Sequence, residues 1–378
     1  MRNILHIING YCGNKVYRNL VTILDSLGIR QLIYIPIRSL KDQSRFRNFE
    51  LKNSIYYYSH IFKTLFDRLF FFRKIRKISR DIERNKDFSH DMLIHAHTLF
   101  SDGGVALSLH RKYKMEYLVA VRNTDVNFFY KYFFFLRGYG ENIMLQAKQV
   151  IFLSPGYQET VLKKYVKTES REKIERKSMI IPNGTDAFWQ DHIFQRIHAN
   201  DLKIKLIYVG EIRRNKNIHN TIKAVELLRK GGLDIRLWVI GYGLNDEIGY
   251  VRRIRKICDS LPYVDAVDQV QNQEALMQYY RDADIFIMPS FTETFGLVYA
   301  EAMSQGLPLI YSKGQGIDGY FGDGEAGYAV DPHDPEDIAG KVKEILQRYL
   351  KISNFCSVQA GQFNWDRIGA IYKSLYEP

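Results

Sequence analysis

Short apolar runs alternate along the whole chain with longer segments in which apolar residues recur at helical spacing. The runs are apolar at nearly every position, as strands buried on both faces must be. Such alternation predicts parallel β-sheets covered by α-helices on both faces. We expect strands at residues 3–8, 31–35, 92–97, 117–121 and 150–153 in the first half, and at 205–209, 235–240, 263–267, 285–288 and 307–311 in the second.

The chain of 378 residues is long enough for two domains, and each half supplies about five strands. We therefore expect an α/β protein with two Rossmann-like, doubly wound parallel-sheet domains, residues 1–190 and 200–362. The pattern pauses between them in a polar stretch at 186–201. Doubly wound sheets bind ligands at the carboxyl ends of their strands, so two facing sheets would form a cleft with one substrate on each domain.

Charge is distributed unevenly between the halves. Residues 1–186 contain 32 Lys and Arg against 17 Asp and Glu, whereas residues 187–378 contain 22 against 25, so the net charge of +12 comes from the first half. The two halves are therefore expected to face different partners. Three scattered cysteines fit a reducing compartment, and no apolar stretch approaches the roughly 18 residues of a membrane span. These features predict a cytoplasmic protein.

The clearest chemical signal lies in residues 284–303, which read as a buried strand, a tight turn and the start of a helix. The amides of a helix N-terminus attract phosphate or sugar oxygens. Glu293, in the turn, can accept hydrogen bonds from a polyol, and Glu301, one to two turns into the helix, can hold vicinal ribose hydroxyls. Alternatively, Glu293 caps the helix and Glu301 is a solvated surface acid.

The loop after the strand at 205–209 is rich in cations. Fixed cations there would stabilise the negative charge that a diphosphate leaving group gains as its glycosidic bond breaks. The alternative is an ordinary basic surface loop. A weaker signal is the pair of glycines after the strand at 235–240, because strand-end glycines are common in α/β proteins. The positions concerned are Gly210, Arg213, Arg214 and Lys216 in the first loop, and Gly241 and Gly243 around Tyr242 in the second.

Together these segments resemble glycosyltransferase family 4, whose members are retaining enzymes of the GT-B fold. The match runs in order along most of the chain, from Gly13 to the closing helix, and the ordered set is more specific than any one piece. Its pieces are Glu293-x7-Glu301 with Phe291-Thr-Glu-Thr-Phe-Gly-Leu, residues 210–217, Ile181-Pro-Asn-Gly-Thr-Asp leading into an interdomain hinge, Glu325-Ala-Gly-Tyr-Ala-Val and Phe363-Asn-Trp-Asp.

The resemblance implies a role for each matching position. Glu293 would contact the donor sugar, Lys216 would neutralise the diphosphate, and the base would pack near residues 268–270. The closing helix, 363–378, would return to the N-terminal domain. The family usually needs no metal, so no metal or other cofactor is expected. The implied donor-binding positions are Gly13, Gly210, Arg214, Gly241, Tyr242, Asp268, Val270, Thr294, Phe295, Gly296, Leu297 and Glu301.

Two departures from the family pattern affect the implied site. Glu211 stands where the family commonly has Arg after the glycine of the diphosphate loop, so Arg213 or Arg214 would supply the positive charge instead. Residues 122–125, Arg-Asn-Thr-Asp, stand where it often shows His-Gly-Thr-Asp. Arg122 could therefore bind phosphate or acceptor, and Asp125 remains a polar contact. His97, at the end of the strand at 92–97, could line the cleft or be a satisfied core residue.

Aromatic and basic residues are interleaved at positions 56–86. Phe62, Phe66 and Phe70 recur at four-residue spacing before a basic run, which predicts a helix that lies in an anionic headgroup layer with its aromatics inserted. A second such cluster spans 128–139. The alternatives are a core-facing helix with a solvated basic side, or binding of single-stranded nucleic acid. No nucleic-acid recognition module accompanies the pattern, so no nucleic-acid partner is expected.

The sequence as a whole predicts a metal-independent retaining glycosyltransferase, either hexosyl- or N-acetylhexosaminyl-transferring. It would move a sugar from a nucleotide-diphosphate donor to a glycan or lipid-linked acceptor, in surface polysaccharide or glycolipid synthesis at the inner face of a membrane. One alternative is a nucleotide-sugar epimerase or a phosphorylase with the same architecture. Another is a non-catalytic protein that binds lipid or nucleic acid and no nucleotide sugar.

Overall fold

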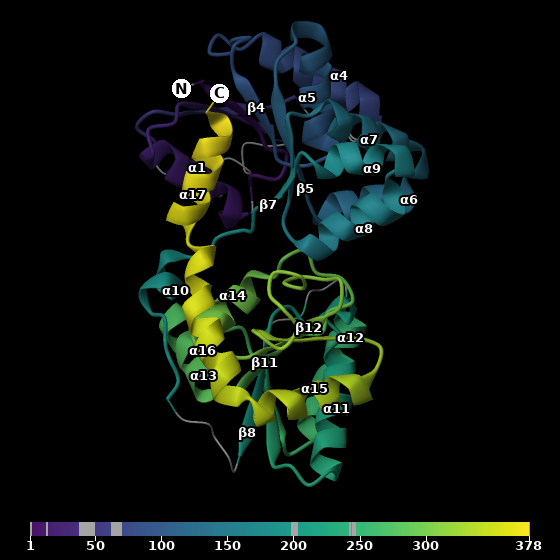
Figure 1. Ribbon diagram of the computed structural model, residues 1–378, viewed down its shortest axis with the longest axis vertical. Helices are drawn as coiled ribbons and strands as arrows, with labels where there is room; N and C mark the ends of the chain where they lie inside the picture. Colours follow the sequence, from purple (N-terminus) through teal and green to yellow (C-terminus); the bar gives the residue numbers. More distant parts are fainter. Residues whose placement is uncertain are drawn as a thin grey trace. The chain divides into compact units, whose positions relative to one another are not determined.

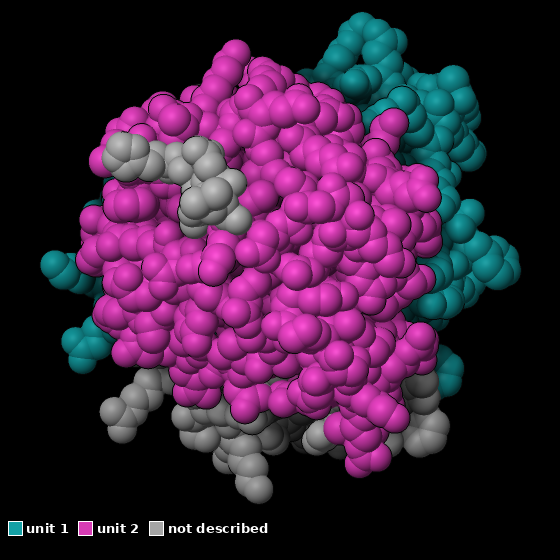
Figure 2. Space-filling view, turned by 90° about the horizontal axis from the view of Figure 1, so that it is seen from below, with its two compact units in different colours: residues 1–153, 158–183, 365–378 teal, residues 154–157, 184–364 magenta. Residues whose placement is uncertain are grey.

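The computed structural model describes residues 2–12, 14–37, 50–61, 70–197, 203–241, 243 and 247–377. The chain forms two compact units, which Figure 2 colours separately. Unit 1 comprises Met1–Leu153, Gln158–Asn183 and Trp365–Pro378, and unit 2 comprises Ser154–Tyr157 and Gly184–Asn364. The main crossing between them falls at Asn183–Gly184, within the segment expected to lead into a hinge. The C-terminal residues Trp365–Pro378 belong to unit 1.

Unit 1 is built on a seven-stranded sheet in the order β3-β2-β1-β4-β5-β6-β7, with all strands parallel. The first strand in the sequence, β1, lies inside the sheet between β2 and β4 and is buried at every position, so successive connections run outward in both directions. The point where the order reverses lies between β1 and β4. The strands are β1 (Ile4–Ile7), β2 (Gln31–Pro36), β3 (Ile55–Ser59), β4 (Leu93–Ala96), β5 (Tyr117–Val121), β6 (Gln149–Phe152) and β7 (Ser178–Ile180).

Helices cover both faces of this sheet (Figure 1). On one face α1 packs against the C-terminal helix α17, and Leu20, Leu24 and Tyr372 share a buried cluster with the sheet. On the other face α4, α5 and α7 pack together. The helices are α1 (Lys15–Ser26), α4 (Phe71–Glu83), α5 (Ser101–Tyr113), η1 (Asp125–Phe129), α6 (Tyr130–Tyr132), η2 (Phe134–Leu136), α7 (Arg137–Gln146), α8 (Pro155–Tyr165), α9 (Thr168–Glu175) and α17 (Trp365–Tyr376).

Unit 2 repeats the plan with a six-stranded parallel sheet in the order β10-β9-β8-β11-β12-β13, so its order reverses between β8 and β11. The strands are β8 (Ile204–Val209), β9 (Ile235–Ile240), β10 (Val264–Val267), β11 (Ile285–Ile287), β12 (Leu309–Ser312) and β13 (Gly327–Val330). The helices are α10 (Ala187–Asp191), η3 (Arg214–Lys216), α11 (Ile218–Lys230), α12 (Ile248–Ser260), α13 (Gln273–Asp282), α14 (Leu297–Ser304), α15 (Pro335–Gln347), α16 (Tyr349–Gln359) and η5 (Ala360–Phe363).

The ten predicted strands are all present, and the fold class is confirmed. Three further strands, β3, β7 and β13, escape the sequence analysis, and each is the outermost strand of its sheet. An edge strand has one neighbour, so it is short or mixed in polarity and lacks the continuous apolar run of a central strand. Residues 56–58, which open the aromatic and basic stretch, lie on β3. Phe62 and Phe66 of the predicted helical stripe lie outside the described residues.

None of the helices in the part of the chain that the structure describes has the length and apolarity required to cross a membrane.

Candidate functional site

The loops at the carboxyl ends of β8 and β11 lie side by side in unit 2, because these strands are neighbours in the sheet. The sheet order reverses at this pair, and open α/β sheets bind ligands where that happens. The loop after β8 contains Lys216, and the loop after β11 contains Glu293. Sequence-distant residues with the predicted chemistry are thus brought to the position that the fold favours for a ligand.

Asparagine side chains join the two loops. Asn215 Nδ2 donates to the carbonyl of Thr292 (2.8 Å), and the Thr292 hydroxyl donates to Asn215 Oδ1 (2.6 Å). Asn217 is fully buried, has a left-handed backbone with φ of 56°, and donates from Nδ2 to the carbonyl of Pro289 (3.0 Å). Buried amides paired in this way fix a loop firmly, because leaving them unpaired would be costly. The loops therefore hold the side chains between them in a set geometry.

Lys216 and Glu293 form an ion pair at the centre of this arrangement. Lys216 Nζ lies 2.5 Å from Glu293 Oε2, and the two side chains are 20% and 14% exposed. The other carboxylate oxygen, Oε1, accepts the Thr294 amide at 3.0 Å. The backbone of Glu293 is held as well, because its amide donates to Gln315 Oε1 (3.0 Å) and its carbonyl accepts the amide of Gly316 (2.8 Å). Glu293 is thus fixed on every side by the loops after β8, β11 and β12.

Helix α14 begins four residues after Glu293, at Leu297. Gly296 has φ of +75°, a region that side chains disfavour, and a Cβ there would lie 2.6 Å from the Tyr299 ring. This turn sets the first helical residue, Leu297, and with it the amides of buried Thr294 and Phe295 at the helix N-terminus. Glu301, one turn into α14, is half-buried, and the Tyr280 hydroxyl lies 3.5 Å from its Oε2. Its carboxylate is therefore positioned by a contact and is not freely solvated.

Acidic side chains contact both of the other basic residues in the loop after β8. Arg213 Nη1 lies 3.5 Å from Glu211 Oε2, and its Nε lies 3.4 Å from Glu247 Oε1. The Arg214 amide donates to Glu247 Oε2 at 2.7 Å, while its guanidinium lies 5.6 Å from the centre of the Tyr250 ring. Glu211, which stands in place of the family's usual Arg, therefore pairs with Arg213 and lowers the net positive charge of the loop.

The two glycines at the ends of β8 and β9 meet. A Cβ at Gly241 would lie 1.8 Å from the Gly210 carbonyl oxygen, so only glycine fits there. Gly210 itself has φ of +157°, close to extended backbone. Asp268 and Val270 lie in the loop after β10, and Asp268 is exposed and paired with Arg255 at 2.6 Å. The predicted donor contacts Gly13 and Tyr242 lie outside the described residues.

The predicted acceptor residues lie at the carboxyl edge of the unit 1 sheet. Arg122 is buried, donates from Nη1 to Asn183 Oδ1 (2.9 Å) and packs over Tyr17 with its guanidinium 5.6 Å from the ring centre. Asp125 has no exposed surface and accepts three backbone amides, those of Leu99, Phe100 and Arg122, at 2.9 to 3.0 Å. Burial raises the pKa of Asp125 to about 6, against the lowering effect of these hydrogen bonds. Its carboxylate joins the loops after β4 and β5.

His97 lies in a buried histidine cluster with His6 and His95. His97 Nε2 lies 2.8 Å from His6 Nδ1, and His95 Nδ1 lies 2.6 Å from the Tyr376 hydroxyl on α17. Among the described residues these three could supply ligand atoms for a metal within 4.8 Å of one another. The rings of His95 and His97 are stacked, however, with centroids 4.0 Å apart and planes inclined by 21°, so their lone pairs lie in two nearly parallel planes. The arrangement fits core packing better than metal binding.

A further polar pair lies at the reversal point of unit 1, and the sequence reasoning missed it. Asp102, at the start of α5, is fully buried, and its Oδ1 accepts hydrogen bonds from the amide and Nδ2 of Asn9. Burial raises the pKa of Asp102 to about 6. Asn9 follows β1 and Asp102 follows β4, so both stand where a doubly wound sheet binds ligand. The available signal was a polar residue in the loop after β1 and another in the first turn of the helix that follows β4.

The sequence also contains Asp282-Ala-Asp284, the spacing that metal-dependent transferases use. These residues precede β11, so they lie at the amino end of the sheet, opposite Glu293. Asp284 is buried and accepts the Lys205 amide at 2.8 Å. The pair is therefore part of the framework of unit 2.

Comparison with known proteins supports this description of unit 2. Residues 190–357, which make up most of unit 2, match the model of the family described as glycosyl transferases group 1. D-inositol 3-phosphate glycosyltransferase from Paenarthrobacter aurescens is 28% identical over 178 residues, which are 45% of this chain and 43% of the relative. The alignment thus spans less than half of that relative's length.

Solved structures match both units. Sucrose-phosphate synthase from Thermosynechococcus elongatus has a TM-score of 0.76 at 20% identity, covering 100% of this chain and 98% of that one. The HepE protein of Anabaena, in complex with UDP and glucose, has a TM-score of 0.68 at 17% identity, with 99% of each chain covered. Identities this low establish the fold alone. The fold is the two-domain GT-B fold, as the sequence predicts. Its second unit is similar to the glycosyl transferases of group 1.

Proposed function

We propose that this protein is a retaining glycosyltransferase that moves a sugar from a nucleotide-diphosphate donor to a glycan or lipid-linked acceptor. The observation that carries the proposal is the Lys216–Glu293 ion pair, held at the reversal point of the unit 2 sheet. It combines a cation for a diphosphate with a carboxylate for sugar hydroxyls. The match of residues 190–357 to the group 1 glycosyl transferases supports the same reaction class.

The donor would lie across the carboxyl ends of β8, β11 and β10. Its diphosphate would meet Lys216, Arg213 and Arg214, which stabilise the charge of the leaving group as the glycosidic bond breaks. Such cations do for a diphosphate what a divalent metal does in other transferases, so the proposed reaction is metal-independent. The Thr294–Leu297 amides would bind sugar and phosphate oxygens at the N-terminus of α14.

Glu293 and Glu301 would fix the two ends of the donor. Glu293 sits in the turn before α14, where it would accept hydrogen bonds from the transferred hexose or N-acetylhexosamine. Glu301 lies one turn further along, where it would hold the ribose, and the base would pack near Asp268–Val270. The HepE neighbour is a complex with UDP and glucose, which makes a UDP-sugar the first donor to test.

The acceptor would be bound by unit 1, near Arg122 and Asp125. The acceptor hydroxyl would attack the anomeric carbon on the face that the nucleotide leaves, and the leaving phosphate would take its proton. No protein base is then required. The P. aurescens relative is named for inositol 3-phosphate, so an inositol phosphate belongs among the acceptors tried, beside glycans and lipid-linked sugars.

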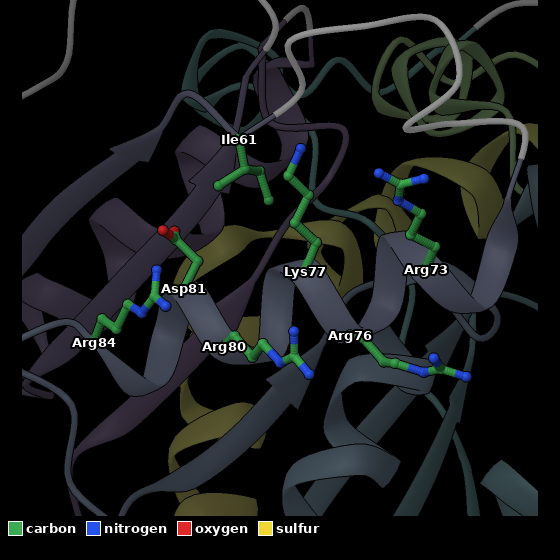
Figure 3. Close-up of a pocket in the computed structure, with 7 residues that line it drawn as sticks. All are labelled: Ile61, Arg73, Arg76, Lys77, Arg80, Asp81 and Arg84. Carbon is green, nitrogen blue, oxygen red and sulfur yellow. The ribbon is translucent and has the colours of Figure 1, made fainter.

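We also propose that the basic surface of unit 1 holds the protein at the cytoplasmic leaflet, where surface polysaccharide or glycolipid is assembled. Helix α4 follows the predicted aromatic stripe and carries most of the basic run at 56–86. Its side chains border a hollow of about 530 Å³ (Figure 3). The lining residues are Ile61, Arg73, Arg76, Lys77, Arg80, Asp81 and Arg84.

A thermal-shift panel of UDP-, GDP- and ADP-sugars tests the donor site. A donor that binds the native state raises the melting temperature, and the shift identifies the nucleotide. We expect one nucleotide class to raise it, and Lys216→Ala to abolish the shift. Transfer to an acceptor should then require that donor. Donor consumption without acceptor would indicate an epimerase, and a panel without any shift would overturn the proposal in favour of a non-catalytic binding protein.

A further inference from the structure

Exposed large aromatic side chains gather almost entirely on unit 1. Within the described residues, Phe194 is the one large exposed aromatic that lies elsewhere. Phe134 and Phe135 are 73% and 64% exposed, values that leave most of each ring in water. We call the whole set the aromatic patch; it consists of Phe70, Phe72, Phe128, Tyr132, Phe134 and Phe135.

Tertiary contacts bring the two segments of the aromatic patch together. Phe71 lies at the start of α4, and its ring centroid is 5.8 Å from that of Phe129 and 5.9 Å from that of Tyr139. Phe72 lies 5.2 Å from Tyr139. The less exposed rings thus anchor the patch, and the exposed rings project from one continuous surface. Contiguous apolar surface of this kind marks an interaction site, since a soluble surface rarely keeps it uncovered.

Positive charge borders the aromatic patch. Helix α4 begins at Phe71 and presents Arg73, Arg76 and Arg80 on its exposed turns, and Arg84 follows its last residue (Figure 3). A second hollow, of about 410 Å³, joins the patch directly. It is lined by Phe72, Ile75, Arg76, Leu107, Ser108, Arg111, Lys112 and Tyr139. Inserted aromatics beside Lys and Arg match the boundary of an anionic bilayer, where acyl chains meet phosphate headgroups.

The aromatic patch lies at the same edge of the unit 1 sheet as the proposed acceptor contacts. The segment Phe128–Phe135 follows β5 and begins three residues after Asp125, and Phe70 precedes α4 in the connection from β3. Both segments therefore stand at the carboxyl edge of the sheet. The same edge carries Arg122 and Asp125, the proposed acceptor contacts.

We propose that the aromatic patch inserts into an anionic phospholipid bilayer, with lipid phosphates held by α4 and by the hollow beside Phe72. This insertion presents the acceptor edge of unit 1 to an acceptor embedded in the membrane. The choice of acceptor rests on the proposed function, whereas the insertion does not. Exposed Phe and Tyr make the patch more than an electrostatic surface, so binding has both a salt-sensitive and an apolar component.

Vesicle flotation of the full chain tests the insertion. The variant Phe134→Ser/Phe135→Ser should bind phosphatidylglycerol-containing vesicles about tenfold or more weakly, because two rings lose their burial in the bilayer. Both residues are exposed, so folding should be unaffected. The matched control is Val358→Ser/Leu350→Ser, which alters exposed apolar residues of unit 2 and should bind like the unmodified chain. Arg76→Gln should weaken binding about fivefold on anionic vesicles alone.

The depth of insertion into the bilayer is measured with the variant Phe134→Trp. Lipids brominated on the acyl chain should quench the fluorescence of this tryptophan. Quenching equal to that of the unmodified chain, or flotation unchanged in the serine double variant, would overturn insertion. Concentration-dependent dimers lost in that variant, without vesicle binding, would assign the patch to a second copy. A UDP-sugar thermal shift is measured in parallel. A variant that binds donor but no vesicles separates failure of this inference from failure of the proposed function.

Discussion

Lys216 and Glu293 are 77 residues apart in the sequence, yet their side chains meet at 2.5 Å. Neither residue is placed by its own element alone. Lys216 ends the short turn η3 after β8, and Glu293 lies between β11 and α14. Parallel pairing of β8 with β11 brings the two loops together, and the amides of Asn215 and Asn217 hold them.

The first prediction concerns this pair. Glu293→Ala and Lys216→Ala should each lower the rate of sugar transfer by about a hundredfold to a thousandfold, because fixed electrostatic groups at a reacting centre are worth that much. The check is the rate constant with the donor identified by thermal shift. Lys341→Ala removes a surface ion pair with Glu344 in the same unit, and should leave the rate unchanged. An active Glu293→Ala enzyme would contradict the assignment.

Glu301 should affect donor binding more than turnover. Its replacement by alanine removes a charge-assisted hydrogen bond to the ribose, so the KM for donor should rise about tenfold to a hundredfold. The rate constant at saturating donor should change little. Tyr280→Phe is the control, since it removes only the 3.5 Å hydroxyl contact behind Glu301. An equal loss in both kinetic constants would place Glu301 in the reaction itself.

Gly241→Ala tests the close approach of β8 and β9. The added Cβ would meet the Gly210 carbonyl oxygen at 1.8 Å, and backbone must move, so the variant should lose about 3 kcal/mol or more of stability. Gly340→Ala, within α15, meets nothing within 4 Å and should instead stabilise the protein by about 0.5–1 kcal/mol. Guanidinium unfolding of both variants measures the difference. Equal stability would show that β8 and β9 separate more easily than the structure indicates.

The buried histidines predict an acid-dependent loss of stability in unit 1. Burial lowers the pKa of His6 from 6.5 to about 3, and lowers the pKa of His95 and His97 well below that ordinary value. Below pH 6.5 the unfolded chain therefore binds protons that the folded chain does not, so stability falls as the pH drops toward 3. Each histidine contributes up to about 1.4 kcal/mol per pH unit. The groups that face the cluster are Tyr17, Arg122, Tyr372 and Tyr376.

Two carboxyls oppose this effect. Asp102 and Asp125 have a pKa near 6, above the unfolded value of 3.8, so between these values the folded chain binds the extra protons. Asp102→Asn should thus make the fall of stability with acid steeper, whereas His6→Leu should make it shallower. Unfolding free energies at pH 7.5, 6.5, 5.5 and 4.5 provide the test. If the unmodified chain and the two variants lose stability equally with falling pH, the pKa values of Asp102 and His6 are not shifted by folding.

The sequence by itself determined the fold class and the residue types of the proposed donor site. Nine of the ten predicted strands lie inside their sheets and are visible as largely apolar runs, because a central strand of a parallel sheet must be apolar on both faces. The turn at Glu293 and Gly296 is visible because glycine and proline interrupt that pattern. Both patterns are local, so they can be recognised without knowing which residues are neighbours in space.

Only the tertiary structure decided what depends on neighbours in space. The edge strands β3, β7 and β13 owe their conformation to one pairing partner each, and Asn9 meets Asp102 only through the pairing of β1 with β4. Glu211 could be noticed in the sequence, but its pairing with Arg213 could not. The aromatic patch likewise forms from two segments more than 50 residues apart, joined by the rings of Phe71 and Phe129. Such contacts depend on distances that strand order and helix packing set.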